Sequence, residues 1–227
     1  MKFVLVDIDE TMISVPKGIN AASSAVMFER VFGVSAHEEL IDNVGKTEQG
    51  IIKEVLHKVG VEIITIPQKA YKVWGEVTDQ MLKTNPVRIL PGMLEFLDAL
   101  KNNKEICLTL LTGNSPWRAE AKLQSAHFDS YFKDPDTKVL SGVFGDMTAK
   151  RDELFDLIKQ KAQPNDTFVI VDDSLIGAKM AKKHGAHMIM VATGKATGEE
   201  LRAYTPNVFP DFGEERWKSA VSLIERL

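Results

Sequence analysis

The chain has 227 residues, which suits one core domain with an insertion better than two average domains. Hydrophobic residues make up 44% and charged residues 26%, so the composition is that of a globular protein and excludes a disordered or fibrous one. The net charge of -4 argues against nucleic acid as a bulk partner, although it leaves room for a local basic pocket that binds a small anion.

The first predicted strand opens the chain. The apolar run from Phe3 to Val6 ends at Asp7, which is the pattern of a buried strand with acids at its carboxyl end. Because side chains alternate along a strand, Asp7 and Asp9 point to one side, and their charges repel unless a cation lies between them. The run is too short for a signal peptide or a membrane span. We therefore expect a cytoplasmic protein that binds no membrane.

A helix-rich stretch follows, from residue 15 to residue 85. Apolar residues recur at helical spacing in Ala21–Phe32, Glu48–Val59 and Pro67–Lys83, whereas Val61–Ile66 fits either a short strand or an extended connection. The predicted apolar face of the first helix consists of Ala22, Ala25, Val26, Phe28 and Phe32. Because this stretch leaves and re-enters the sheet at one edge, we predict a helical cap domain (15–85) that serves as a lid on a core domain (1–14 and 86–227).

Strands and helices alternate along the rest of the chain. Strands are predicted at Ile106–Leu111, Thr167–Val171 and Met188–Val191. Helices are predicted at Gly92–Lys101, Pro116–Ser125, Arg151–Ala162, Ile176–His184, Glu199–Tyr204 and Glu214–Leu227. This alternation predicts an α/β fold with a Rossmann-like parallel sheet and helices on both of its faces.

Polar residues follow three of the predicted strands where each strand ends. Asp7 and Asp9 follow the first, Thr112-Gly113-Asn114 the second and Asp172-Asp173 the third. A single acidic strand end is more often a turn or a helix N-cap. Three of them meet at one edge of a parallel sheet, however, and oxygen ligands of this kind favour Mg²⁺ and a bound phosphate. The pattern therefore predicts a magnesium and phosphate site.

Together these segments resemble the four sequence motifs of the haloacid dehalogenase superfamily. The resemblance covers the whole chain and rests on Asp7-Ile8-Asp9-Glu10-Thr11, Thr112-Gly113-Asn114, a basic residue at Lys150 or Arg151, and Asp172-Asp173. The stretch between the first two motifs resembles the helical C1 cap of the phosphoglycolate phosphatase-like members. The resemblance therefore implies a capped hydrolase.

The resemblance also implies a role for individual residues. Asp7 would be the nucleophile, and Asp9 would be the general acid and base. Thr112 would hold the transferred phosphoryl group. The Arg151 side chain would steady the nucleophile and the phosphate, with Lys150 as the alternative. A carboxylate can attack phosphorus and divide a difficult hydrolysis into two easier steps, so these roles are chemically sound.

The metal site implied by the resemblance uses acids from two strand ends. Mg²⁺ would be held by Asp7, Asp172 and Asp173 together with the backbone carbonyl of Asp9. Gly177 stands where many capped members carry a further aspartate, so the adjacent Asp172-Asp173 pair would serve instead.

The substrate contacts are predicted from the second motif and from the cap. The turn Thr112-Gly113-Asn114 would bind the phosphate, and Lys46 is either a substrate contact or a solvated lysine. Gly45-Lys46-Thr47 is not a P-loop, because the required glycine and preceding strand are missing. Glu10 stands where the superfamily often has glycine, but it touches none of the expected roles.

We therefore predict a Mg²⁺-dependent phosphatase that acts on a small phosphorylated metabolite, with phosphoglycolate or a similar phosphomonoester as the leading candidate. The alternatives are a β-phosphoglucomutase-like phosphotransferase, a phosphonatase, and a non-catalytic phosphate-binding protein on the same fold. Asp9 disfavours a dehalogenase, because a halide leaves without a proton. We expect a monomer or a homodimer.

Overall fold

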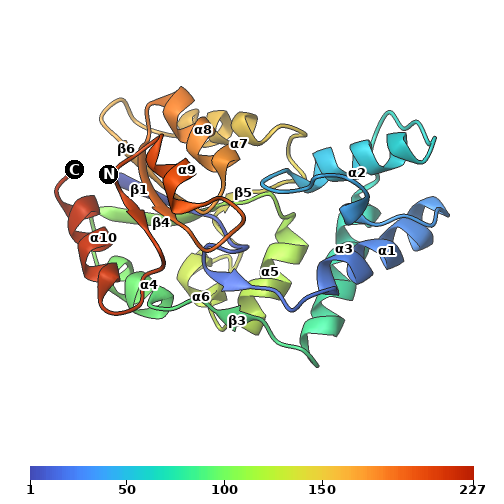
Figure 1. The fold of residues 1–227 in the computed structure, drawn as a ribbon, viewed down its shortest axis with the longest axis horizontal. Helices are drawn as coiled ribbons and strands as arrows, with labels where there is room; N and C mark the ends of the chain where they lie inside the picture. Colours follow the sequence, from blue (N-terminus) through green and yellow to red (C-terminus); the bar gives the residue numbers. More distant parts are fainter.

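The computed structural model describes residues 1–227 and contains the parallel sheet that the sequence predicts (Figure 1). Its strands follow the order β5-β4-β1-β6-β7-β8, with β1 between β4 and β6. The strands are β1 (Lys2–Val6), β4 (Ile106–Leu111), β5 (Gly142–Val143), β6 (Thr167–Asp172), β7 (His187–Val191) and β8 (Val208–Phe209). Since all neighbouring pairs are parallel, the acidic ends of β1 and β6 emerge at the same edge.

Helices cover both faces of the sheet because its strands are apolar on both sides. Val4 and Val6 pack with residues of α4, α5 and α10, whereas Leu5 packs on the opposite face with residues of α7 and α8. The helices outside residues 15–85 are α4 (Met93–Lys101), α5 (Pro116–Ser125), α6 (Asp129–Phe132), α7 (Arg151–Lys159), α8 (Leu175–His184), α9 (Gly198–Arg202) and α10 (Arg216–Glu225). The α/β class predicted from the sequence is thus confirmed.

Residues 15–85, here called the helical segment, form a bundle beside the sheet (Figure 1). The bundle has an apolar core of its own, which includes Phe28, Ile52 and Trp74. Its elements are α1 (Ile19–Phe32), the 3₁₀ turn η1 (Glu38–Leu40), α2 (Glu48–Lys58) and α3 (Gln68–Leu82). The division of the chain into a core domain and a cap domain stays a prediction.

A short antiparallel ladder joins the helical segment to the sheet. It pairs β2 (Ile13–Ser14) with β3 (Arg88–Ile89), so the two connections run side by side. The sequence did not reveal this ladder, nor did it reveal β5, β8, α6 or η1, because elements of two to four residues are too short to show a periodicity. Val61–Ile66 is an extended connection and not a strand.

The first helix buries a different face from the predicted one. Ser23 and Ser24 are fully buried, whereas Ala22 is exposed. The buried hydroxyls are satisfied, since the indole N–H of Trp74 donates to Ser23 Oγ at 3.2 Å and the backbone N–H of Glu38 donates to Ser24 Oγ at 3.0 Å. Paired hydroxyls can be buried at little cost, so apolar spacing alone misplaced this face.

The helical segment also packs directly on α5. A Cβ atom built on Gly75 of α3 would lie only 2.4 Å from the Cβ of Trp117, so the absence of a side chain permits this close approach. The contact brings α5, which begins just after the second predicted motif, between the sheet edge and the helical segment. The same helix therefore presents side chains to both parts of the molecule.

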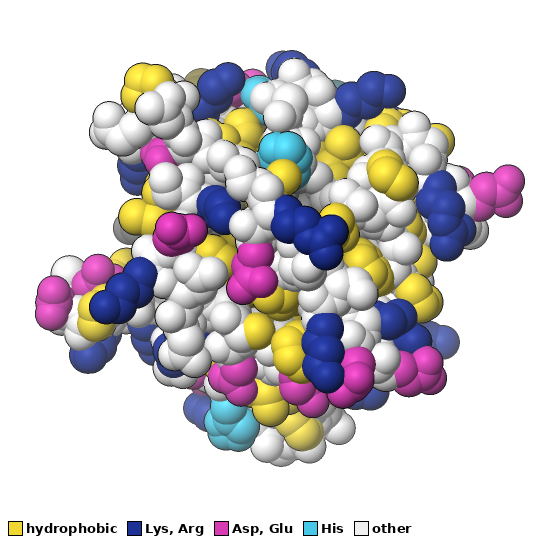
Figure 2. Space-filling view, turned by 90° about the vertical axis from the view of Figure 1, so that its left-hand side faces the viewer, with side chains coloured by type: hydrophobic (Ala, Val, Ile, Leu, Met, Phe, Trp, Pro, Cys, Tyr) yellow, Lys and Arg dark blue, Asp and Glu magenta, His cyan; other side chains and the backbone are white.

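The face at the end that holds the two chain termini carries charges of both signs. Figure 2 shows Lys and Arg side chains interspersed there with Asp and Glu and with hydrophobic groups. No helix is both long enough and apolar enough to cross a membrane.

Candidate active site

A cavity of about 230 Å³ lies where the sheet edge meets the helical segment. Asp7, Asp9 and Asn114 line it from the strand ends, as the sequence predicts. Val44 and Ile51 are the hydrophobic residues of the lining, and the other side chains that line it are polar or charged. Such a wall suits a small polar ligand better than an apolar one.

Three carboxylates and one guanidinium form what we call the strand-end cluster: Asp7, Arg151, Asp172 and Asp173. Arg151 Nη2 lies 3.0 Å from Asp7 Oδ2 and 2.9 Å from Asp172 Oδ2. It also donates to the backbone oxygen of Leu111 at 3.2 Å. Oxygen atoms of the three carboxylates lie within 4.8 Å of one another. All four side chains are buried, so their charges are poorly screened.

Burial and mutual repulsion shift the acids of this cluster. Burial raises the pKa of Asp7 to about 6, although Arg151 opposes the shift. Burial and the neighbouring Asp172 and Asp7 raise the pKa of Asp173 well above its usual range. The cluster thus holds more negative charge than its guanidinium balances. Oxygen donors this close together fit a hard divalent cation such as Mg²⁺.

Two departures from the superfamily pattern have a local structural basis. A Cβ atom on Gly177 would lie 2.2 Å from Cγ of Asp172, so α8 passes too close to this carboxylate for an aspartate to fit at 177. Glu10 has a φ of 53°, in the left-handed region that favours glycine. The turn after the first motif therefore keeps the conformation of a glycine turn without the glycine.

The side chain of Asp9 does not join the strand-end cluster. Lys122 Nζ lies 2.7 Å from both of its carboxylate oxygens, and Asn114 Nδ2 donates to Oδ2 at 2.7 Å. Burial by itself would raise the pKa of Asp9, but the charges of Lys122 and Arg118 outweigh it and hold this pKa below its usual value. The Thr112 hydroxyl accepts from Asn114 Nδ2 at 2.9 Å, and Thr112 lies outside the cavity lining.

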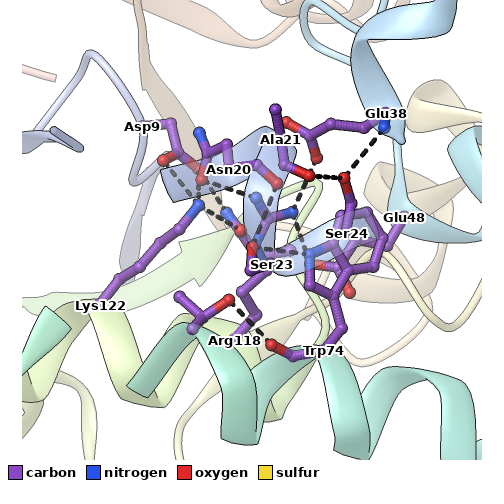
Figure 3. A network of polar contacts seen from close by, with 12 residues as sticks. Asp9, Asn20, Ala21, Ser23, Ser24, Glu38, Glu48, Trp74, Arg118 and Lys122 are labelled. Carbon is purple, nitrogen blue, oxygen red and sulfur yellow. Dashed lines mark hydrogen bonds and ion pairs between the residues drawn. The ribbon is translucent and has the colours of Figure 1, made fainter. Parts of the chain in front are cut away.

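A second charged group, the helix-side cluster, consists of Asn20, Glu38, Glu48, Arg118 and Lys122 (Figure 3). Arg118 Nη1 lies 3.3 Å from Glu38 Oε2 and 3.3 Å from Glu48 Oε1, and Nη2 donates to Asn20 Oδ1 at 2.7 Å. The guanidinium also lies 4.3 Å from the centre of the Trp74 ring. This one arginine of α5 therefore contacts α1, η1, α2 and α3 of the helical segment.

Backbone hydrogen bonds fix the start of α2 on the second predicted motif. The N–H of Glu48 donates to the oxygen of Gly113 at 2.8 Å, and the N–H of Gln49 donates to the oxygen of Gly145 at 2.8 Å. A Cβ atom on Gly113 would lie 2.1 Å from the oxygen of Lys46. Lys46 lines the cavity, and its ammonium is 2.6 Å from Glu54 Oε2. It is thus a cavity residue whose charge is already paired.

The two candidates for the third-motif basic residue lie in different places. Arg151 is only 4% exposed in its side chain and contacts Asp7. The side chain of Lys150 is 76% exposed and lies 3.9 Å from Glu153. The structure brings Arg151 into the site and leaves Lys150 on the surface, because α7 begins at Arg151 whereas Lys150 precedes it in an extended conformation.

No member of the helix-side cluster is predicted as a site residue from the sequence. Arg118 and Lys122 lie four residues apart and so share one face of α5, which is the single signal that the sequence contains. A basic pair at this spacing is usually a solvated face. Here it is buried, because the helical segment covers it with two glutamates and an asparagine.

Comparisons with known proteins agree with this architecture. Residues 4–191 match the family described as haloacid dehalogenase-like hydrolase. The crystal structure of CbbY from Rhodobacter sphaeroides with phosphate superposes with a TM-score of 0.68 at 19% identity, covering 93% of this chain and 95% of that chain. No curated protein matches the sequence.

Two further solved structures are similar over nearly their full length. A haloacid dehalogenase hydrolase of family IA, variant 3, from Entamoeba histolytica has a TM-score of 0.64 at 22% identity and covers 99% of this chain and 100% of that one. A protein from Bacteroides vulgatus, described provisionally as a β-phosphoglucomutase, has a TM-score of 0.58 at 21% identity and covers 97% of this chain and 90% of that one. At these identities the likeness concerns the fold.

Proposed function

Because the chain belongs to the haloacid dehalogenase-like hydrolases, we propose that it is a Mg²⁺-dependent phosphatase acting on a small phosphorylated metabolite. The observation that supports this proposal is the strand-end cluster. Asp7 opens into the cavity, and the Arg151 guanidinium lies 3.0 Å from its carboxylate. A carboxylate beside a fixed positive charge is suited to attack a phosphoryl group, whose oxygens the guanidinium can bind.

In the first step a carboxylate oxygen of Asp7 forms a bond to phosphorus, and the bond from phosphorus to the ester oxygen breaks. For this step Asp9 first takes up a proton from solvent, against the effect of Lys122 and Arg118, which lower its pKa, and then gives that proton to the departing oxygen. The product is an aspartyl-phosphate on Asp7. In the second step water attacks the phosphorus while Asp9 takes a proton from it, and inorganic phosphate leaves. Arg151 offsets the charge on the phosphoryl oxygens in both steps.

Asp7, Asp172 and Asp173 would hold Mg²⁺, with the backbone carbonyl of Asp9 as a further ligand. When bound, the ion supplies positive charge that offsets the repulsion among these acids and the charge of the phosphoryl oxygens. Gly113 and Asn114, which line the cavity, would then bind the phosphate from the sheet side. Thr112 would join them only if its hydrogen bond from Asn114 opened. The start of α2, hydrogen-bonded to this turn at 2.8 Å, would exclude bulk water from the other side.

The size of the cavity supports a small phosphomonoester, with phosphoglycolate as the leading candidate. A cavity of about 230 Å³ has room for a phosphate and a leaving group of a few heavy atoms. Lys46 lies at the cavity wall and would contact such a leaving group if its pair with Glu54 opened.

A phosphotransferase of the β-phosphoglucomutase kind is the second candidate. It is supported by the close contact of the helical segment with the sheet edge, because a transferase must shield the aspartyl-phosphate from water. The two candidates predict different products. Transfer would give a phosphorylated acceptor, whereas hydrolysis gives inorganic phosphate.

The test is the hydrolysis of 4-nitrophenyl phosphate with Mg²⁺ and with a chelator, in the wild type, in Asp7→Asn and in the exposed control Asp136→Asn. We expect release of inorganic phosphate that needs both Mg²⁺ and Asp7, and that the control leaves unchanged. Activity that persists in Asp7→Asn would exclude the aspartyl-phosphate. A folded wild type that releases no phosphate from any phosphomonoester would instead support a phosphate-binding protein.

A further inference from the structure

Lys122 is a buried charge to which the proposed reaction assigns no role. Its side chain is only 1% exposed, although it sits on α5 among small and apolar neighbours such as Ala119 and Leu123. Taking an ammonium out of water is costly unless close partners compensate it, and an apolar side chain at this position would avoid that cost. The reason for the charge must therefore lie in what the ammonium contacts.

The ammonium group of Lys122 forms a ring of hydrogen bonds with Asp9 and Asn114, two residues that line the cavity. An ammonium has three donors, and all three of them are used at 2.7 Å, on Asp9 Oδ1, Asp9 Oδ2 and Asn114 Oδ1. Asn114 completes the ring, because its Nδ2 donates to Asp9 Oδ2 at 2.7 Å and to Thr112 Oγ1 at 2.9 Å. The amide orientation is unambiguous, since a reversed amide would turn its own donors toward the ammonium.

This ring fixes both oxygens of Asp9. A carboxylate that accepts hydrogen bonds at only one oxygen can still rotate. The Asp9 carboxylate accepts them at both oxygens, from a buried cation and an amide, so its orientation at the cavity wall is fixed. Figure 3 shows the Lys122 side chain extending to Asp9, with Asn20 and Arg118 beside its ammonium. Arg118 is fixed by Asn20 and the glutamates of the helical segment, so the neighbouring positive charge on α5 is held rigidly in place.

We infer that Lys122 is a positioning residue that, with Asn114, holds the Asp9 carboxylate where it can exchange a proton with the leaving oxygen. The inference rests on the proposed function, in which Asp9 is the acid and base. Its main consequence is a dependence on the leaving group. Nitrophenolate leaves readily without a proton, but an alkoxide must receive one, so a displaced Asp9 should impair alkyl phosphates far more than aryl phosphates.

The experiment compares kcat and KM for 4-nitrophenyl phosphate and for an alkyl phosphate that the wild type hydrolyses. The variants are Lys122→Met, Lys122→Arg and Asp9→Asn, with Gln124→Met as the matched control on the exposed face of α5. We expect Lys122→Met to lower kcat for the alkyl phosphate by about 10²-fold and for the aryl phosphate by less than about tenfold, with KM nearly unchanged. Lys122→Arg keeps the charge and should recover part of the loss.

The control Gln124→Met should match the wild type on both substrates. An equal loss on both phosphates in Lys122→Met would indicate a merely structural lysine and overturn the inference. If Lys122→Met shows no cooperative thermal unfolding, Lys122→Arg decides: a loss confined to the alkyl phosphate supports the inference, and no loss or a uniform loss contradicts it.

Asp9→Asn separates this inference from the proposed function. If Asp9→Asn is selective for the alkyl phosphate and the Lys122 variants are not, the inference alone is wrong. If Asp9→Asn itself shows no such selectivity, Asp9 does not transfer the proton, and both the acid role in the proposed function and the inference are wrong.

Discussion

The strand-end cluster and the helix-side cluster meet at one cavity but balance their charges in different ways. In the strand-end cluster, three carboxylates surround one guanidinium, and buried acids are left in excess. In the helix-side cluster, Arg118 is paired with Glu38 and Glu48, and Lys122 is paired with Asp9. We therefore expect the two clusters to have different roles. The first cluster is built to receive a cation and a phosphate, and the second is built to hold a fixed geometry without them.

The largest effect that would test these different roles is expected from Arg151→Met. The variant should lower kcat/KM for 4-nitrophenyl phosphate by about 10³-fold, because it removes the protein cation nearest to Asp7. The neighbouring Lys150→Met is the matched control, and it should stay within about 0.5 kcal/mol of the wild type in stability because Lys150 is exposed. Steady-state kinetics and urea unfolding measure both. An equal loss of activity in Lys150→Met would show that the two residues share the role.

An effect of comparable size, on stability instead of activity, is expected from Arg118→Met. The free energy of unfolding should fall by about 3–5 kcal/mol, because Glu38 and Glu48 would remain buried without their cation. Urea denaturation measures the loss, with the exposed Arg226→Met as the control, for which a change within about 0.5 kcal/mol is expected. Adding Glu38→Gln and Glu48→Gln to Arg118→Met should restore part of the stability. If Arg118→Met were as stable as its control, the helix-side cluster would not hold the fixed geometry described above.

The smallest effect concerns the response of the two clusters to Mg²⁺. A metal concentration of 100 times the dissociation constant should stabilise the wild type by about 2.7 kcal/mol. Asp173→Asn should lose this response and melt no lower than the wild type without metal, because it also removes repulsion from Asp7 and Asp172. Glu38→Gln should keep the response. Thermal unfolding at constant ionic strength measures all three proteins, and a full Mg²⁺ response in Asp173→Asn would contradict the assignment of the metal site.

The strand-end cluster could be predicted because its positions are encoded locally. Buried parallel strands appear as apolar runs, and the residues just after such runs must lie at one edge of the sheet. This reasoning places Asp7, Asp172 and Asp173 at that edge. What the pattern did not contain was the direction of each side chain. Asp9 was expected beside Asp7, yet it points to Lys122, and the Thr112 hydroxyl is hydrogen-bonded to Asn114 behind the cavity wall.

The helix-side cluster could not be predicted because it is buried by the packing of the helical segment on α5. The serines of α1 and the basic residues of α5 have the spacing of solvated positions. They are buried because α3 packs on α5 at Gly75 and Trp117. The resulting polar interface leaves no pattern in the sequence. The spacing of apolar residues shows which face of a helix is apolar and which is polar. It does not show which neighbouring element packs on the polar face.

By itself, the amino-acid sequence determined the α/β class, the parallel sheet and the acidic residues at its edge, because these follow from alternation and from apolar runs along the chain. The tertiary structure alone decided that Arg151 and not Lys150 reaches Asp7, and that Lys122 fixes Asp9. The physical reason is the range of the interactions. Strand formation and burial are recorded within a few residues, whereas the pairing of buried charges joins residues such as Asp9 and Lys122 that are 113 positions apart.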